Sequence, residues 1–190
     1  LTACGGDTDG EVDALALPEP SEPPVSSPDD TTYVEGASYG EDEKQVFHPA
    51  YFPDTRTPTP LVVYIHGGGF TGGDPAAAWN RTDFVEPLLA ERIAVASCGY
   101  RLLDDVDTEG VIKPLTDSAR CLQTLRHHAA QLNIDPDRVV PAGTSAGAGT
   151  ALWLGTHDDL ADPAAEDPVL AASTRVDGVI LWETQATYDL

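Results

Sequence analysis

The sequence is poor in basic side chains and has no long apolar run. Its 190 residues contain 10 Lys and Arg against 32 Asp and Glu, which gives a formal net charge of −22. A chain this acidic repels phosphate backbones and anionic lipid head groups, which argues against nucleic-acid binding and against a polybasic membrane patch. The longest apolar segments, such as residues 61–65, are far shorter than the roughly 18 residues that cross a bilayer. The sequence therefore predicts no membrane-spanning segment.

No initiator methionine precedes the first four residues, Leu1-Thr2-Ala3-Cys4. Their pattern resembles the lipobox of bacterial lipoproteins, whose cysteine is lipidated. The resemblance implies that residues 1–4 end a signal peptide and that Cys4 carries acyl chains, each bound to a membrane by about 0.8 kcal/mol per buried methylene. It also implies a location in the bacterial cell envelope, periplasmic or at the outer membrane. The alternative is a chance cysteine in a leader segment.

Residues 5–32 contain acidic side chains and prolines but no Lys or Arg. Large apolar side chains are few, so this stretch cannot bury enough surface to offset the entropy lost on ordering it. We therefore predict a disordered tether over residues 5–32 and one folded domain over residues 33–190.

Two further cysteines, Cys98 and Cys121, fall within the predicted domain. They could pair in an oxidising compartment, but Cys98 ends an apolar strand pattern and Cys121 lies in a helical one. We expect two separate buried thiols.

The domain alternates short apolar strands with amphipathic helices. Residues 33–52 predict an antiparallel pair at a sheet edge. Apolar runs without polar alternation, typical of strands covered on both faces, occupy residues 61–65, 93–98, 138–142 and 176–182. Helical patterns follow Thr82 and Asp117. This order predicts an α/β fold with a mostly parallel sheet and helices on both faces, with ligands at the carboxyl ends of the strands.

A serine lies between two glycines in the segment Gly143-Thr144-Ser145-Ala146-Gly147, which matches G-x-S-x-G between a strand and a helix. The glycines leave room for a tight turn that exposes the Ser145 hydroxyl, and the Ala146 N–H lies at a helix N-terminus, where negative charge is stabilised. The alternative is a small-residue turn in which the serine caps the helix.

A second glycine motif, His66-Gly67-Gly68-Gly69-Phe70, follows the strand at residues 61–65. It is an HGGG-type loop, whose backbone N–H groups can complete an oxyanion hole. We expect His66 to hold the loop by hydrogen bonds. A phosphate-binding loop is the alternative, but no G-K-[ST] follows.

Together with the segment 99–102 (GYRL), these motifs resemble the hormone-sensitive-lipase and carboxylesterase branch of the α/β-hydrolase fold. The resemblance covers residues 33–190. It implies that Ser145 is the nucleophile, that Gly68, Gly69 and Ala146 donate to the oxyanion, and that Gly67 shapes the loop. It implies no metal or organic cofactor and a small-molecule ester substrate.

The resemblance also predicts an acid and a histidine after the serine. Only His157 follows Ser145, and its place about 18 Å along the same helix rules it out as the base. Glu183 is the only candidate acid, but the branch that the chain resembles does not place its acid there. We therefore expect an amino-terminal part of a hydrolase whose last strands are missing, and which is inactive alone. His127, His128 and the acidic run 157–167 are interpreted as solvated surface and not as metal sites.

The sequence thus favours a serine carboxylic-ester hydrolase that works through an acyl-enzyme on Ser145. The alternatives are a serine peptidase of the same fold and a non-catalytic binding protein on the same scaffold. The oligomeric state cannot be predicted.

Overall fold

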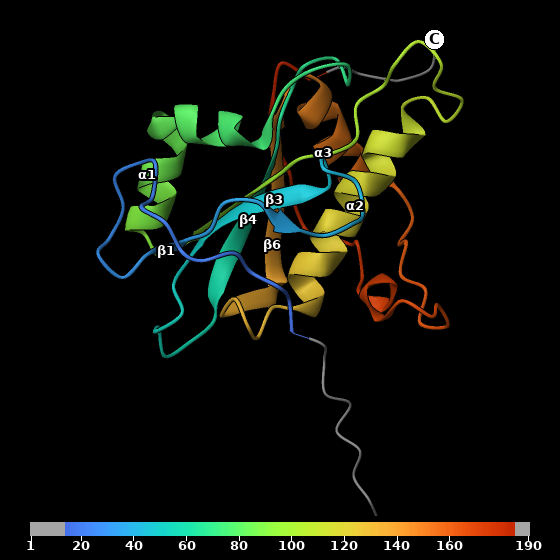
Figure 1. The fold of residues 1–190 in the computed structure, drawn as a ribbon. Helices are drawn as coiled ribbons and strands as arrows, with labels where there is room; N and C mark the ends of the chain where they lie inside the picture. Colours follow the sequence, from blue (N-terminus) through green and yellow to red (C-terminus); the bar gives the residue numbers. More distant parts are fainter. Residues whose placement is uncertain (1–13, 185–190) are drawn as a thin grey trace, which may run out of the picture.

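The computed structural model describes residues 14–184, which form one mixed sheet with helices on both faces (Figure 1). Within this part of the chain the strand order is β1-β3-β5-β4-β6-β7, with β2 also paired to β3. Strands β5, β4, β6 and β7 run parallel, whereas β1, β2 and β5 are antiparallel to β3. The bounds are β1 Thr32–Tyr33, β2 Ala37–Ser38, β3 Val46–Tyr51, β4 Thr59–Ile65, β5 Ala94–Cys98, β6 Ile134–Thr144 and β7 Ile180–Trp182. The predicted fold class and its antiparallel margin are confirmed.

The central strand β4 is apolar and buried from Leu61 to Ile65 because both of its faces are covered. Along β4, Leu61 and Val63 belong to one core cluster, which includes α2 (Ile112–His127). Val62 and Tyr64 belong to a second cluster on the opposite face, with α1 (Thr82–Ala90) and the short helix η1 (Pro75–Asn80). Successive side chains of a strand point to opposite faces, so a doubly covered strand needs an unbroken apolar run.

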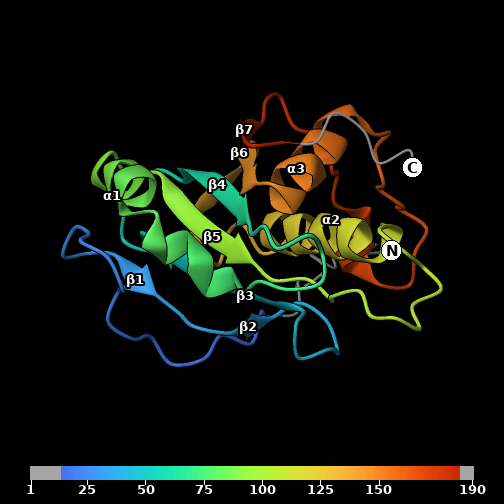
Figure 2. The same ribbon diagram turned by 90° about the horizontal axis from the view of Figure 1, so that it is seen from above.

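The third helix, α3 (Ala146–Thr156), packs on the same face as α2. Figure 2 shows α1 on one side of the sheet and α2 and α3 on the other. A short helix η2 (Pro168–Ala171) lies against α2. Because α2 begins at Ile112, Asp117 lies within the helix instead of preceding it as the sequence pattern suggested. Its carboxylate is buried and bonds Arg101, in the segment that follows β5.

The predicted tether is wrong from residue 14 onward, while residues 5–13 lie outside the described residues. Leu15 is 8% exposed and packs in the core cluster beneath α2. Its N–H donates to Gln131 Oε1 and its carbonyl accepts from Gln131 Nε2, both at 2.8 Å. Ser21 pairs with Tyr33, and Arg92 forms an ion pair with Asp30. Prolines stiffen the unfolded chain, which lowers the entropy cost of laying this segment on the domain.

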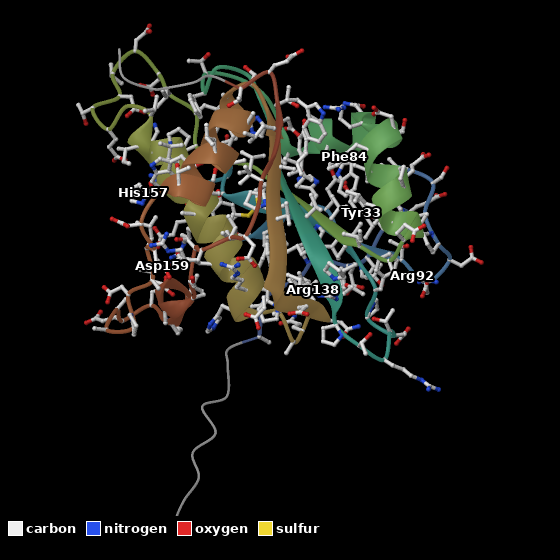
Figure 3. All side chains as sticks on the ribbon, turned by 180° about the vertical axis from the view of Figure 1, so that it is seen from behind. Tyr33, Phe84, Arg92, Arg138, His157 and Asp159 are labelled. Atoms are coloured by element: carbon white, nitrogen blue, oxygen red, sulfur yellow. A yellow bond between two sulfur atoms is a disulfide. The ribbon has the colours of Figure 1, made fainter. Side chains whose placement is uncertain are left out.

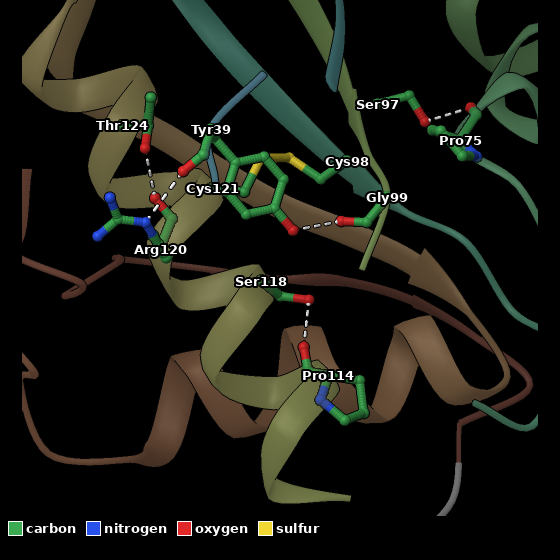
Figure 4. Close-up of a disulfide and its surroundings, with 10 residues drawn as sticks. All are labelled: Tyr39, Pro75, Ser97, Cys98, Gly99, Pro114, Ser118, Arg120, Cys121 and Thr124. Carbon is green, nitrogen blue, oxygen red and sulfur yellow. Dashed lines mark hydrogen bonds between the residues drawn. A yellow bond between two sulfur atoms is a disulfide. The ribbon is translucent and has the colours of Figure 1, made fainter. Parts of the chain in front are cut away.

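The expectation of two separate thiols is also wrong, because Cys98 and Cys121 form a disulfide (Figure 4). The pattern placed them correctly, at the end of β5 and within α2. What it did not show is that these two elements pack directly, with 6.5 Å between the two Cα atoms, a normal distance for a disulfide. Both cysteines are fully buried.

Across residues 14–184, no helix combines the length and apolar character that crossing a bilayer requires. Cys4 lies outside the described residues, and its lipidation stays a prediction.

Candidate functional site

Ser145 occupies a strained position between β6 and α3. Strand β6 ends at Thr144 and α3 begins at Ala146, which is buried, and Ser145 between them has φ 54° and ψ −119°. A non-glycine residue in this conformation costs of order 1–3 kcal/mol, and such residues cluster at functional sites. We call residues 143–147 the serine turn.

The two glycines of the serine turn are required by close backbone approach. A Cβ on Gly143 would lie 2.4 Å from the carbonyl of Gly147, within the turn itself. A Cβ on Gly147 would lie 2.0 Å from the carbonyl oxygen of Ile65. The first glycine therefore lets the turn close, and the second lets α3 pack on the end of β4.

The loop after β4, residues 66–73, lies beside the serine turn, and we call it the glycine loop. A Cβ on Gly67 would lie 3.4 Å from Ser145 Cβ and 2.8 Å from the Thr144 carbonyl oxygen. Gly68 and Gly69 follow with φ 118° and 61° and are exposed, as backbone that receives a ligand must be. The topology thus brings the two predicted halves of an oxyanion hole to the same edge of the sheet.

His66 holds the glycine loop rather than facing Ser145. Its Nδ1–H donates to the Gly67 carbonyl at 2.7 Å, and its ring stacks on Tyr100 with 4.1 Å between ring centroids. The Tyr100 hydroxyl donates to the His66 carbonyl at 2.9 Å. Burial lowers the pKa of His66, while the bond to Gly67 and the charge of Asp74 oppose that shift. His66 is therefore a neutral structural residue at neutral pH.

This shift predicts how stability depends on pH. Unfolded His66 has an ordinary pKa near 6.5, so below that pH the unfolded state binds a proton that the folded state refuses. The stability contributed by neutral His66 is complete above pH 6.5 and is lost as the pH falls toward the lowered folded pKa. We expect His66→Gln to make the free energy of unfolding fall less steeply between pH 7.5 and 5.5, measured by urea denaturation.

A wild-type slope in the His66→Gln variant would contradict the assignment.

Three side chains that the sequence analysis did not single out support the serine turn. The Tyr64 hydroxyl lies 3.2 Å from Thr144 Oγ1, and Arg81 Nη1 donates to the same oxygen at 3.3 Å. The Arg81 guanidinium also stacks on Trp182, with 4.6 Å to the ring centroid, and the Trp182 carbonyl accepts the Ser145 N–H at 2.9 Å. No sequence motif marks these contacts, because they join four separate elements.

The other candidate residues lie apart from Ser145 or at the rim of the site. His157 follows the last turn of α3 (Figure 3), at the end of the helix opposite to Ser145. Glu183 follows β7, is exposed and has φ 54°, next to the Trp182 carbonyl that binds the serine turn. Among residues 14–184 no group of three His, Cys, Asp or Glu side chains could hold a metal ion.

A cavity of about 820 Å³ lies beside the glycine loop but is not lined by Ser145. Thr71 contributes one wall and residues 101–104 and 106–109 another, with charges of both signs. The Phe70 carbonyl accepts the Leu103 N–H at 2.8 Å and so joins the two walls.

A sequence model of the family described as BD-FAE matches residues 49–184, which include both glycine motifs. The chain belongs to the BD-FAE family. Its match begins in β3 and ends just after β7, so the serine turn and the glycine loop both fall within the family's shared region.

Relatives of this BD-FAE chain include esterases. It is 28% identical to chlorogenic acid esterase of Aspergillus niger over 177 residues, which cover 86% of the chain and 33% of that protein. Among solved structures, esterase B of Lactobacillus rhamnosis is 32% identical with a TM-score of 0.54, covering 66% of this chain and 40% of that one. Thermogutta terrifontis esterase 2 with bound propionate has a TM-score of 0.63 at 23% identity, covering 79% and 54%.

These matches show an α/β-hydrolase fold and a carboxylesterase-like family. The chain spans about a third of the length of the Aspergillus enzyme and about half that of the Thermogutta esterase.

Proposed function

We propose that the full-length protein is a serine carboxylic-ester hydrolase with Ser145 as its nucleophile. The observation that supports this most directly is the strained Ser145 backbone in a turn packed against the glycine loop. A serine that merely capped a helix would need no left-handed φ, and Ser145 makes no side-chain capping bond to α3. The esterases among the relatives support the same reaction class.

In the proposed reaction Ser145 Oγ attacks the ester carbonyl carbon, and its proton passes to a general base. The C=O electron pair moves onto the oxygen, where the N–H groups of Gly68, Gly69 and Ala146 would stabilise the negative charge. Collapse breaks the bond to the alcohol oxygen, which leaves with the proton, and water then releases the acid from Ser145. Each oxyanion donor is worth about 3 kcal/mol of the barrier.

We propose that a histidine of the full-length protein beyond residue 190 supplies the general base. Two of the five histidines in this chain are placed where they cannot act as the base for Ser145. The His66 ring is held by Gly67 and Tyr100, and His157 lies past the far end of α3. The 190-residue chain alone is therefore proposed to be inactive. The net charge of −22 favours neutral esters over anionic ones.

The experiment compares matched esters and amides with the full-length protein. We expect hydrolysis of p-nitrophenyl acetate and butyrate without hydrolysis of the corresponding p-nitroanilides. A fluorophosphonate probe should attach to Ser145, with the modified residue identified by mass spectrometry.

The outcomes separate the proposal from its two rivals. Cleavage of the anilides at rates near those of the esters would replace it with a peptidase. Absence of both hydrolysis and labelling would support a binding protein on a hydrolase scaffold, and labelling of another residue would overturn the role of Ser145.

The disulfide supports the predicted location, because disulfides persist in oxidising compartments and are rare in the cytosol. A lipid anchor at Cys4 in the bacterial cell envelope agrees with this and remains our proposal for the full-length protein.

A further inference from the structure

Two links join the segment after β5 to helix α2. The Cys98–Cys121 disulfide is the first. The second is the ion pair of Arg101 with Asp117, in which Nη2 donates to Oδ1 at 2.7 Å and Nε to Oδ2 at 2.9 Å. Cys98 and Arg101 are three positions apart after β5, and Asp117 and Cys121 are four positions apart, about one turn of α2. Both links therefore fix the same short segment, residues 98–101, to the same helix face.

The second link is strong because it is bidentate and its carboxylate is buried and fully bonded. The Asp117 side chain is only 3% exposed, and it also accepts the Arg101 N–H at 2.9 Å and Gln45 Nε2 at 2.9 Å. Bidentate pairs of this kind are the stronger and more directional ion pairs. On the other side of the segment, the Gly99 carbonyl accepts the Tyr39 hydroxyl at 2.7 Å beside the disulfide (Figure 4).

Tyr100, between the two links, is the residue that holds the glycine loop. Its ring stacks on His66, lies 6.0 Å from the Phe70 ring centroid, and its hydroxyl bonds the His66 carbonyl. Tyr100 thus contacts both ends of the H-G-G-G-F motif. Any movement of residues 98–101 away from α2 would carry this ring with it, and the loop would lose its support.

We propose that the disulfide and the Arg101–Asp117 ion pair position the glycine loop by fixing Tyr100, and that they contribute to turnover by this route. Cys98, Cys121, Arg101 and Asp117 are positioning residues, since they act through Tyr100 and His66. The proposal rests on the proposed function for its catalytic consequence, but the mechanical link does not depend on it.

The test uses the full-length protein and the double variant Cys98→Ala/Cys121→Ala. We expect kcat for p-nitrophenyl acetate to fall about tenfold while KM changes less than twofold, because a displaced oxyanion donor affects the transition state more than substrate binding. Leu132→Ala is the matched control. It removes a buried side chain just before β6 begins, at the opposite end of the sheet, and should lower Tm without changing kcat by more than twofold.

Hydrogen exchange gives a readout that does not need activity. Amides of residues 66–73 should exchange faster in the double alanine variant than in wild type, and should be unchanged in Leu132→Ala. Arg101→Lys keeps the disulfide, so it still tests the proposal if the double alanine variant does not fold. It weakens the bidentate pair, so exchange over the same residues should rise and kcat should fall about threefold.

The inference is overturned if exchange over residues 66–73 stays at the wild-type rate in both Arg101→Lys and the folded double variant. It is also overturned if Leu132→Ala lowers kcat as much as they do. If the wild-type protein has no serine-dependent esterase activity, the proposed function fails, and the exchange comparison alone decides whether these links position the loop.

Discussion

Ser145→Ala is expected to lower kcat/KM for p-nitrophenyl esters by at least about 10⁴-fold in the full-length protein. Alanine cannot form the acyl-enzyme, so only binding and the oxyanion donors remain to favour hydrolysis. The folded state should survive, because alanine tolerates the local backbone about as well as serine and Ser145 makes no side-chain cap to α3. We expect the free energy of unfolding to change by no more than about 0.5 kcal/mol.

Ser26→Ala is the matched control for this experiment. Ser26 is exposed, and its backbone N–H donates to Glu86 at 3.2 Å, a bond that alanine keeps. Its kcat/KM should equal that of wild type. Residual activity of Ser145→Ala above a tenth of wild type would show that the nucleophile is another group.

Gly147→Ala should cause a large loss of stability. The new Cβ would fall 2.0 Å from the Ile65 carbonyl oxygen and 2.6 Å from that of His66, and both are backbone atoms that cannot rotate away. Helix α3 would have to move off the end of β4. We expect the free energy of unfolding to fall by about 3 kcal/mol, the upper end of the usual cost of overpacking, in urea denaturation.

The same methyl group added at Gly178 is the matched control, since nothing lies within 4 Å of its Cβ position. Gly178→Ala should change stability by less than about 0.5 kcal/mol. Equal stability of the two variants would mean that α3 and β4 are not packed at this distance.

The parts of the fold that could be predicted are those that depend on neighbours in the sequence. The unbroken apolar run of β4 indicated a doubly covered strand, and it has one core cluster on each face. The glycines on either side of Ser145 indicated a turn without room for side chains, and Gly143 and Gly147 meet backbone at close range. In both cases a local pattern carries the physical requirement.

The errors concern contacts between segments far apart in the chain. Leu15 lies in an acidic stretch with few large apolar side chains, and its backbone is held by Gln131, 116 residues later. The disulfide depends on the packing of β5 against α2. The periodicity of apolar residues predicts each element but not which elements pack together. The support of Thr144 by Tyr64 and Arg81 likewise joins separate elements. Composition measures the average character of a segment, whereas one well-placed side chain can decide where that segment lies.

The disulfide also determines how the chain between its cysteines can vary. It closes a ring with a sequence separation of 23, and the ring includes the loop that ends at α2 and exposes Val106 at 83% of its surface. The entropy cost of closing a flexible loop grows only with the logarithm of its length, by about 0.6 kcal/mol for each doubling. Insertions near Val106 would therefore cost little, since both ends of the ring stay covalently fixed. We therefore expect this part of the surface to accept changes of length while Tyr100 stays in place.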